Sequence, residues 1–495
     1  MAQAGTLDPN FGTDGYVTFT LNDWNVHGAD ALVLPNGQIM AVAGVYDPTE
    51  DIALARYNAD GTLDATFGDA GVLTIDVNDG SVDWPTDAFL QADGRIVIVG
   101  RIDGAMLVLR LLEDGSLDAS FNGDGWATYD VIPGELDHVG NCAVRPTGEV
   151  VVICSNENES GNGYGSVVQF TPAGALDPAF GTDGVLIVDN GSGSTTEWLH
   201  DLELSNSGSI HVLGTASIDL NSTDDTFVYR ITPTGTLDMD FDEDGYRSVP
   251  IGTDQEILGA LAVTADGEIL VAGSTNMDGL DHPFVARLNV DGTFDAAFGD
   301  AGVHIMTDIT GQSVNDLLVH ASGQVVFSGE AFNGSGTAML IARLNADGSF
   351  DPTFGNGGTT LTQIGSSFGF ESGFTLALAP DGDYIMTGTT GTAPAGNLTQ
   401  VILKYKSGNT SSLAEGDAAS WRFHPNPTSG ELWISAPEER RSSRVRIADA
   451  QGRTVGFVAM DANGVVQLPD ALDAGTYYIS VVGKGSAPRA LTLVR

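Results

Sequence analysis

One short phrase recurs seven times along this chain. The phrase is (Leu/Phe)-Asp-x-x-Phe, and successive copies start 54 to 61 residues apart. A period this regular indicates one repeated supersecondary unit, since a single unit cannot bury its apolar face without neighbours. The copies start at Leu7, Leu63, Leu117, Leu176, Leu237, Phe294 and Phe350.

Each unit carries the pattern of four short strands. In the second unit, β-forming residues flank Asp93-Gly94, a dipeptide typical of hairpin turns. A third strand is expected over 105–112 and a fourth over 125–130, with turn residues between them and no helical periodicity. Four antiparallel strands in about 57 residues describe one blade of a β-propeller.

The two ends of the chain indicate how the ring closes. The last unit has three strands, ending near Lys406, and lacks its phrase and its fourth strand. The chain begins with a phrase and the strand 15–19, which can complete that unit and protect its edge. The sequence therefore predicts an all-β fold, with a seven-bladed β-propeller over residues 1–406 whose last blade is closed by the N-terminal strand.

The charge of the chain is uneven. Residues 407–495 balance nine basic against nine acidic side chains, so the net charge of −46 falls entirely within 1–406. Such a surface repels phosphate groups, which argues against nucleic acid and anionic lipid as partners. Two interpretations remain: a solvation surface suited to salty surroundings, or carboxylate loops that collect divalent cations, of which calcium prefers oxygen ligands. No run of residues is apolar enough to span a membrane.

A basic residue recurs on the third strand of the units, and an aspartate recurs in the phrase that follows it. We predict that the two side chains bond to each other and fasten the strand to the loop, whereas a ring of anion-binding arginines is the alternative. Gln169 occupies the basic position in one unit. The predicted ties join Arg56, Arg110, Arg230, Arg287, Arg343 and Lys404 to Asp8, Asp64, Asp118, Asp238, Asp295 and Asp351.

A second set of positions comes from the loop before the first strand of each unit, which opens beside the propeller axis. Acidic residues recur there, which turn and strand capping explains. Ten residues before the hairpin glycine, histidine or tryptophan occurs only in the first four units, and repetition alone would have given them to all seven. We therefore predict a ligand-binding face formed by His27, Asp30, Trp84, Asp87, His138, Asn141, Trp198 and Asp201.

The repeated unit also resembles a known family. The run Asp-Gly-x-Leu-Asp-x-x-Phe-Gly, with an Asp-Gly hairpin and a strand containing Ala/Val-x-Arg, resembles the delta-60 repeat over residues 5–406. That resemblance implies a β-propeller and a secreted or surface location. It implies no single chemistry.

The C-terminal part resembles a different family. Pro425-Asn426-Pro427-Thr428 opens a segment that continues with Asp449-Ala450-Gln451-Gly452-Arg453 and Leu472-Asp473-Ala474-Gly475-Thr476-Tyr477. These motifs look like the type A C-terminal sorting domain of type IX secretion in Bacteroidota. The resemblance implies export by the type IX machinery through residues 421–495, after a flexible linker at 407–420. Strands and turns over about 75 residues suit a small β-sandwich.

The N-terminus agrees with export. Met1-Ala2-Gln3-Ala4 resembles the end of an Ala-x-Ala cleavage site, which indicates that a signal peptide was removed and Met1 added. We expect an extracellular or outer-membrane-surface protein. Cys142 and Cys154 can face each other across a hairpin, or they are two small filler residues.

No motif of nucleotide binding or catalysis occurs in the chain, so no catalytic residue is assigned. The favoured function is a binding or interaction module, whose ligand is a glycan or a surface protein. The alternative is a metal-dependent extracellular lyase or hydrolase that uses rim carboxylates. The absence of a clustered acid–base pair favours binding, and the chain is more consistent with a protein that is not an enzyme.

Overall fold

The computed structural model consists of strands joined by turns. It describes residues 3–21, 25–46, 50–134, 136–157, 163–188, 196–217, 225–251, 256–277, 279–311, 313–334, 336–365, 370–391 and 398–408, followed by the backbone of seven short strands between 422 and 493. The chain divides into two compact units, Met1–Gly408 and Asn409–Arg495. Among the described residues, no helix has the length and apolar character needed to cross a membrane.

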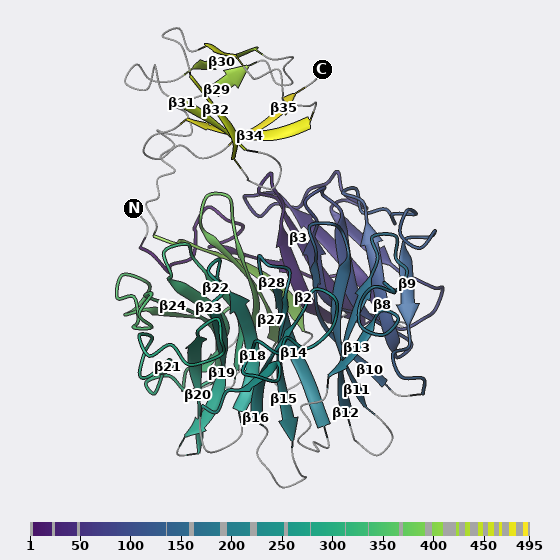
Figure 1. The fold of residues 1–495 in the computed structure, drawn as a ribbon. Helices are drawn as coiled ribbons and strands as arrows, with labels where there is room; N and C mark the ends of the chain where they lie inside the picture. Colours follow the sequence, from purple (N-terminus) through teal and green to yellow (C-terminus); the bar gives the residue numbers. More distant parts are fainter. Residues whose placement is uncertain are drawn as a thin grey trace. The chain divides into compact units, whose positions relative to one another are not determined.

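The first unit is a seven-bladed propeller, as predicted (Figure 1). Each blade is a four-stranded antiparallel sheet, and the first strand of each blade contacts the first strands of both neighbouring blades. Blades 1 to 3 contain β2 (Asn25–Val33), β3 (Ile39–Tyr46), β4 (Glu50–Tyr57) and β5 (Val72–Ile75); β6 (Asp83–Leu90), β7 (Ile96–Ile102), β8 (Ala105–Leu111) and β9 (Trp126–Tyr129); and β10 (Leu136–Val144), β11 (Val150–Glu157), β12 (Gly163–Phe170) and β13 (Val185–Val188).

The remaining blades repeat this order. Blades 4 to 6 contain β14 (Thr196–Leu204), β15 (Ile210–Ser217), β16 (Asp225–Ile231) and β17 (Tyr246–Ser248); β18 (Glu256–Val263), β19 (Ile269–Met277), β20 (Leu280–Leu288) and β21 (Val303–Ile305); and β22 (Ser313–Val319), β23 (Val325–Phe332), β24 (Thr337–Leu344) and β25 (Thr359–Thr362). Blade 7 contains β26 (Phe370–Leu378), β27 (Tyr384–Gly391), β28 (Thr399–Tyr405) and β1 (Tyr16–Phe19).

The N-terminal strand completes blade 7. β1 pairs antiparallel with β28, from Tyr16 opposite Leu403 to Phe19 opposite Gln400. The segment before β1 continues the pairing, because the Gly5 N–H donates to the Lys406 carbonyl at 2.7 Å. The ring is therefore closed by chain segments almost 400 residues apart in the sequence.

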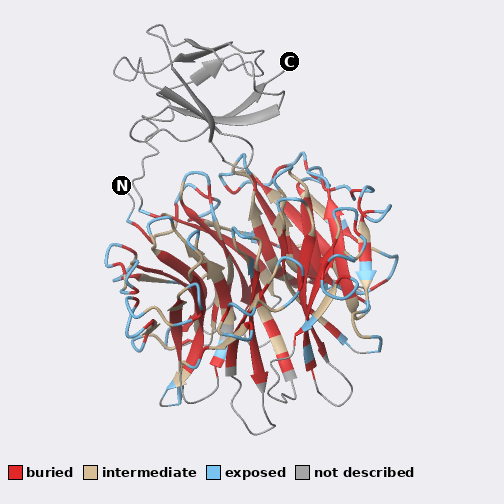
Figure 2. Cartoon of the chain, viewed as in Figure 1, coloured by how far each residue is buried: buried red, intermediate tan, exposed pale blue. Residues whose placement is uncertain are grey.

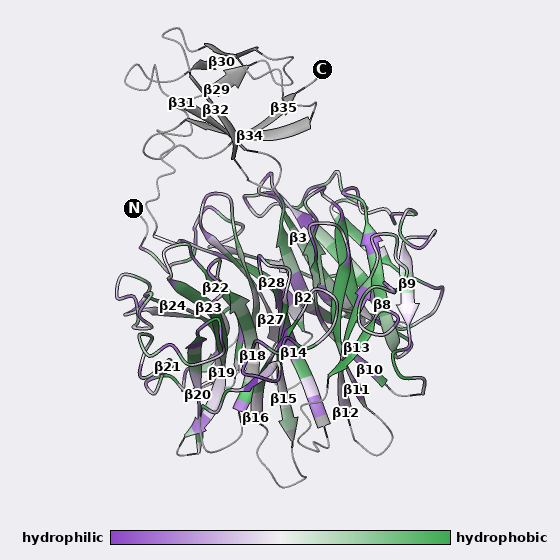
Figure 3. Cartoon of the chain, viewed as in Figure 1, coloured by the Kyte–Doolittle hydropathy of each residue, from purple (hydrophilic) through white to green (hydrophobic). Residues whose placement is uncertain are grey.

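The core lies between the blades (Figures 2 and 3). The second and third strands of each blade are almost continuously apolar and buried, which suits strands covered on both faces by neighbouring blades. The phenylalanine that ends each phrase is at most 1% exposed in all seven copies. Cys142 and Cys154 are also buried, and each lies opposite a valine rather than opposite the other cysteine.

All seven inner strands contain a register shift at the same place. In β2 the shift lies between Gly28 and Asp30, and in β22 it lies between Val314 and Asp316. A bulge of this kind bends the strand and changes the direction of the side chains beside it. It positions the residues of the candidate site.

The second unit contains two antiparallel sheets. One sheet consists of β29 (Arg422–His424), β30 (Glu431–Ser435) and β33 (Val465–Gln467). The other consists of β32 (Thr454–Ala459), β31 (Arg444–Ala448), β34 (Gly475–Val481) and β35 (Arg489–Leu493).

Candidate functional site

The predicted site residues lie on the inner strands, and their carboxylates join neighbouring blades. Asp201 follows the bulge in β14, where one oxygen accepts the Leu202 N–H at 2.8 Å. Its other oxygen accepts the Leu261 N–H of blade 5 at 2.7 Å. The Asn141 side chain adds a third bond from blade 3, at 2.8 Å.

The same arrangement occurs at other blade junctions. Asp87 accepts the Cys142 N–H at 2.7 Å, and Asp316 accepts the Leu376 N–H at 2.6 Å. Asp30 accepts the Ala31 N–H at 2.6 Å and a further backbone N–H from Ala88 of blade 2. The acids predicted to bind ligand are thus engaged by backbone donors, and this geometry gives Asp30, Asp87 and Asp201 a role in holding blades together.

Burial changes the ionisation of these carboxyl groups. It raises the pKa of Asp201 to about 7, and it raises the pKa of Asp316 well above its usual range. Burial also raises the pKa of Asp30 and of Asp87, and the neighbouring charge of Asp30 adds to the shift of Asp87. Removing a carboxylate from water disfavours its charged form more than the backbone hydrogen bonds favour it.

The aromatic residues of the predicted face form two separate pairs. His27 and Trp84 lie with their ring centroids 5.6 Å apart, and Trp84 also contacts Tyr46 at 5.0 Å. His138 and Trp198 lie 4.9 Å apart in an edge-to-face arrangement. Both tryptophans are half-buried, whereas Tyr46 is 44% exposed. We call His27, Trp84, His138 and Trp198 the mouth residues, because they lie where the inner strands begin.

A glycine in the neighbouring blade makes room for the Trp84 ring. It packs over Gly44 of blade 1, where a Cβ atom would lie 2.6 Å from the Trp84 ring. The positions equivalent to the mouth residues in blades 5, 6 and 7 are Ile257, Ser313 and Ser372. Histidine and tryptophan at this repeat position are therefore confined to blades 1 to 4, and Phe374 of blade 7 stacks on His27 with the ring centroids 5.9 Å apart.

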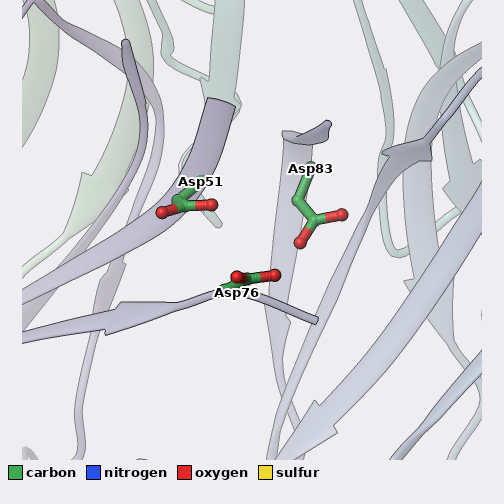
Figure 4. Close-up of side chains that lie close together, drawn as sticks. All are labelled: Asp51, Asp76 and Asp83. Atoms are coloured by element: carbon green, nitrogen blue, oxygen red, sulfur yellow. The ribbon is translucent and has the colours of Figure 1, made fainter. Parts of the chain in front are cut away.

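A group of three carboxylates lies between blades 1 and 2 (Figure 4). Asp51 comes from the start of β4, Asp76 follows β5 and Asp83 begins β6, and ligand oxygens of all three lie within 4.8 Å of one another. Asp83 also accepts the Val77 N–H and the Ser81 hydroxyl, both at 2.7 Å. Burial, followed by the charges of Asp76 and Asp103, raises the pKa of Asp83.

Of these three aspartates, the sequence pattern indicates only Asp83. Asp83 stands at a recurring acidic position, and its equivalents Asp137, Glu256 and Glu371 also accept backbone N–H groups of the preceding loop. This capping agrees with the structural interpretation of the recurring acids. Asp51 and Asp76 belong to other strands of the blade, and only the folded sheet brings them to Asp83.

The basic residues of the third strands form the predicted ion pairs in five blades. In each pair, the arginine Nε lies 2.8 to 2.9 Å from the aspartate of its phrase, and the guanidinium lies 4.6 to 4.9 Å from the phrase phenylalanine. The same guanidinium donates to a backbone carbonyl in the next blade, as Arg287 does to Ala346 at 2.8 Å. The pairs are Arg56–Asp64, Arg110–Asp118, Arg230–Asp238, Arg287–Asp295 and Arg343–Asp351.

Two blades differ from this pattern. The predicted tie between Lys404 and Asp8 is not formed: Lys404 binds Asp381, and Lys406 binds Asp8 at 2.7 Å. The shorter, linear lysine cannot make all the contacts of a guanidinium fork, so two lysines divide them. In blade 3, Gln169 bonds Asp177 at 2.7 Å while Arg145, directly after the inner strand β10, bonds Gln169.

A cavity of about 710 Å³ opens at the opposite ends of blades 2 and 3, away from the mouth residues. Arg95, Arg110 and Arg145 contribute to its lining. Arg95 donates to Asp93, Arg110 donates to Asp118, and Arg145 donates to the Gly208 carbonyl. These guanidinium groups therefore bond to other groups of the protein.

The seven closed blades define a protein of the β-propeller class. The model of a domain of unknown function described as a beta-propeller, DUF5122, matches residues 34–67, 91–121, 206–241, 264–298 and 320–354. None of the curated proteins matches the chain.

Several solved structures are similar to this chain at low identity. PorZ, a surface component of the type IX secretion system of Porphyromonas gingivalis, is 12% identical over 95% of this chain, with a TM-score of 0.40; the chain covers 59% of its length. Polysaccharide lyase Uly1 is 13% identical, with coverage of 77% of this chain and 90% of that chain and a TM-score of 0.47. Drosophila Semaphorin 2a is 8% identical, with coverage of 97% of both chains and a TM-score of 0.47.

Proposed function

We propose that this protein is a secreted or cell-surface propeller that binds a glycan or a surface protein through its mouth residues. The supporting observation is the one-sided pair of half-buried tryptophans, each beside a histidine. A half-buried tryptophan offers an apolar ring face together with a polar N–H, a combination suited to stacking and hydrogen bonding. The repeat does not require tryptophan here, because blades 5, 6 and 7 form with Ile257, Ser313 and Ser372 at the same position.

Charge narrows the class of ligand. With a net charge of −46, the surface repels anionic partners over about 8 Å at physiological salt. Neutral and cationic ligands fit the mouth, and nucleic acid does not. Binding to an array of neutral, cationic and anionic glycans, measured with the wild-type chain and with Trp84→Ala/Trp198→Ala, tests the proposal. Equal binding by both proteins would reject the mouth as the site.

We also propose that residues 421–495 deliver the propeller to the type IX secretion machinery. The support is the resemblance of their motifs to sorting domains, although the Pro425–Thr428 motif lies outside the described residues. A chain ending at Ser407 is expected to fold and to remain inside the outer membrane. Normal surface display of that truncated chain would overturn this part of the proposal.

A second candidate function uses a divalent cation, as a metal-dependent lyase or hydrolase would. The Asp51–Asp76–Asp83 group supports a cation, because it provides oxygen ligands of the kind that calcium prefers. We propose calcium as its ligand. Calorimetric titration with calcium should show binding that Asp76→Asn weakens, while Asp124→Asn, at an exposed aspartate elsewhere, should leave binding unchanged. Activity screens on polysaccharides would then separate a lyase or hydrolase from a binding protein.

A further inference from the structure

The two His–Trp pairs occupy the same repeat positions, and the first pair has further ring contacts with Phe374 and Tyr46. In each pair, histidine lies near the start of one inner strand and tryptophan occupies the same repeat position of the next blade. His27 in β2 faces Trp84 in β6, and His138 in β10 faces Trp198 in β14. The pairs are therefore separated by two blades, or about two-sevenths of a turn around the ring.

Between the two pairs, the inner strands of blades 2 and 3 are joined by hydrogen bonds. The Thr86 hydroxyl donates to the Gly140 carbonyl at 3.0 Å, and Asp87 accepts the Cys142 N–H at 2.7 Å. These bonds hold blades 2 and 3 together without an aromatic ring of either pair. The mouth thus presents two separate aromatic platforms on a rigid support.

The surroundings of the platforms disfavour an acidic ligand. Asp76, Asp103 and Asp130 are exposed near the starts of these inner strands. Burial lowers the pKa of His27, so that its imidazole is neutral at neutral pH and supplies no compensating positive charge. A chain of uronic acids would meet repulsion at this mouth, whereas an uncharged sugar chain would not.

We propose that the ligand of the mouth is an uncharged oligosaccharide long enough to contact both His–Trp pairs at once. This inference rests on the proposed function, and it names the substrate class of the same site. Each platform holds a different sugar unit of the chain, stacked on the tryptophan ring of its pair. A mono- or disaccharide can occupy only one platform.

The affinity should therefore depend mainly on the number of sugar units in the ligand. When two weak contacts are joined in one molecule, the second becomes intramolecular, and affinity rises on the order of 10²-fold without any new contact. Cello-oligosaccharides, xylo-oligosaccharides and malto-oligosaccharides of two and of eight units are suitable uncharged probes. Isothermal titration calorimetry with the full chain should show one of the three series binding on the order of 10² times more tightly at eight units than at two.

Because the two tryptophans occupy the same repeat position, substituting either one should have the same effect. Trp84→Ala and Trp198→Ala should each reduce the affinity for the octasaccharide to about that for the disaccharide, a loss on the order of 10²-fold. Ile257→Ala is the matched control, because Ile257 occupies the same repeat position in blade 5 and is 41% exposed. This control should bind like the wild type. Melting curves of all variants identify any that fail to fold.

The outcomes separate the two proposals. Equal affinity of the wild-type chain for two and eight units would overturn the extended ligand and leave a mouth that binds a single sugar. Equal binding of polygalacturonate octamers would overturn the requirement for an uncharged ligand. A mouth that binds no carbohydrate at all would overturn both this inference and the glycan form of the proposed function. The length comparison needs no substitution, so it decides the matter even if a tryptophan variant misfolds.

Discussion

Replacing Arg287 with methionine tests whether the repeated arginine holds the propeller together. Arg287 makes an ion pair with Asp295, donates to the Ala346 carbonyl of the next blade at 2.8 Å, and lies 4.9 Å from the Phe298 ring centroid. Its side chain is 13% exposed and that of Asp295 is 16% exposed. Methionine keeps an apolar stem of similar length but removes every one of these donors.

The expected cost follows from these contacts. Removing one partner of a largely buried ion pair costs about 3–5 kcal/mol, because the remaining charge loses its compensation. The Ala297 N–H, followed by Arg287, lowers the pKa of Asp295, so this carboxylate stays ionised at neutral pH. With the residual exposure of both side chains, we expect Arg287→Met to lower the free energy of unfolding by about 3 kcal/mol.

Urea denaturation of the full chain, followed by tryptophan fluorescence and circular dichroism, measures this change. Arg247→Met is the matched control, because Arg247 pairs with Asp242 at 3.0 Å with side chains 30% and 35% exposed. A pair this exposed contributes less than about 1 kcal/mol. If Arg287→Met costs no more than Arg247→Met, the arginine is not a structural tie. A double-mutant cycle with Asp295→Asn would show whether the energy belongs to the pair.

Three further predictions concern the ring. Deleting residues 1–19 removes β1 from blade 7 and leaves β28 as an open edge. Size-exclusion chromatography should then show self-association, or calorimetry should show a markedly lower melting temperature. A monomer with an unchanged melting temperature would contradict closure by the N-terminus. The propeller should be more stable at pH 5.5 than at pH 8, because the folded-state pKa of Asp201 is raised to about 7: its contribution is fully present below the unfolded value of about 3.9 and is lost as the pH rises through 7. Asp201→Asn should reduce that pH dependence without abolishing it, because burial also raises the pKa of Asp30, Asp87 and Asp316, and a stability that rises with pH would refute the prediction. Gly44→Ala should displace Trp84 and weaken ligand binding with Tyr46 left in place, which a binding titration checks; unaltered affinity would show that the position of Trp84 does not matter.

The sequence predicted the ring because its signal is local and repeated. Asp-Gly turns between short apolar strands determine each blade, and seven copies make the count independent of any single unit. The pairing of β1 with β28 also followed from the sequence, because the missing strand of the last unit matched the extra strand at the start.

The candidate site was less predictable, because its chemistry depends on contacts between blades. Asp87 and Asp201 belong to recurring acidic positions, yet only the folded ring shows that backbone N–H groups of the next blade occupy their oxygens. The bulge that directs these side chains leaves no clear mark in the sequence. Arg145, which supports Gln169 in blade 3, lies in the loop between β10 and β11, whereas the arginines of the other blades lie on the third strand.

Closure by the first strand also governs when the molecule can fold. Residues 16–19 leave the ribosome early, but their partner β28 at 399–405 is made last among the propeller strands. Such long-range pairing is slow, because the entropy of closing the whole loop must be overcome before any contact rewards it. Until then the chain carries an incomplete blade at one end and an unpaired strand at the other. A half-made propeller therefore has two open strand edges that can pair with other chains, and both stay exposed to such pairing until they meet each other.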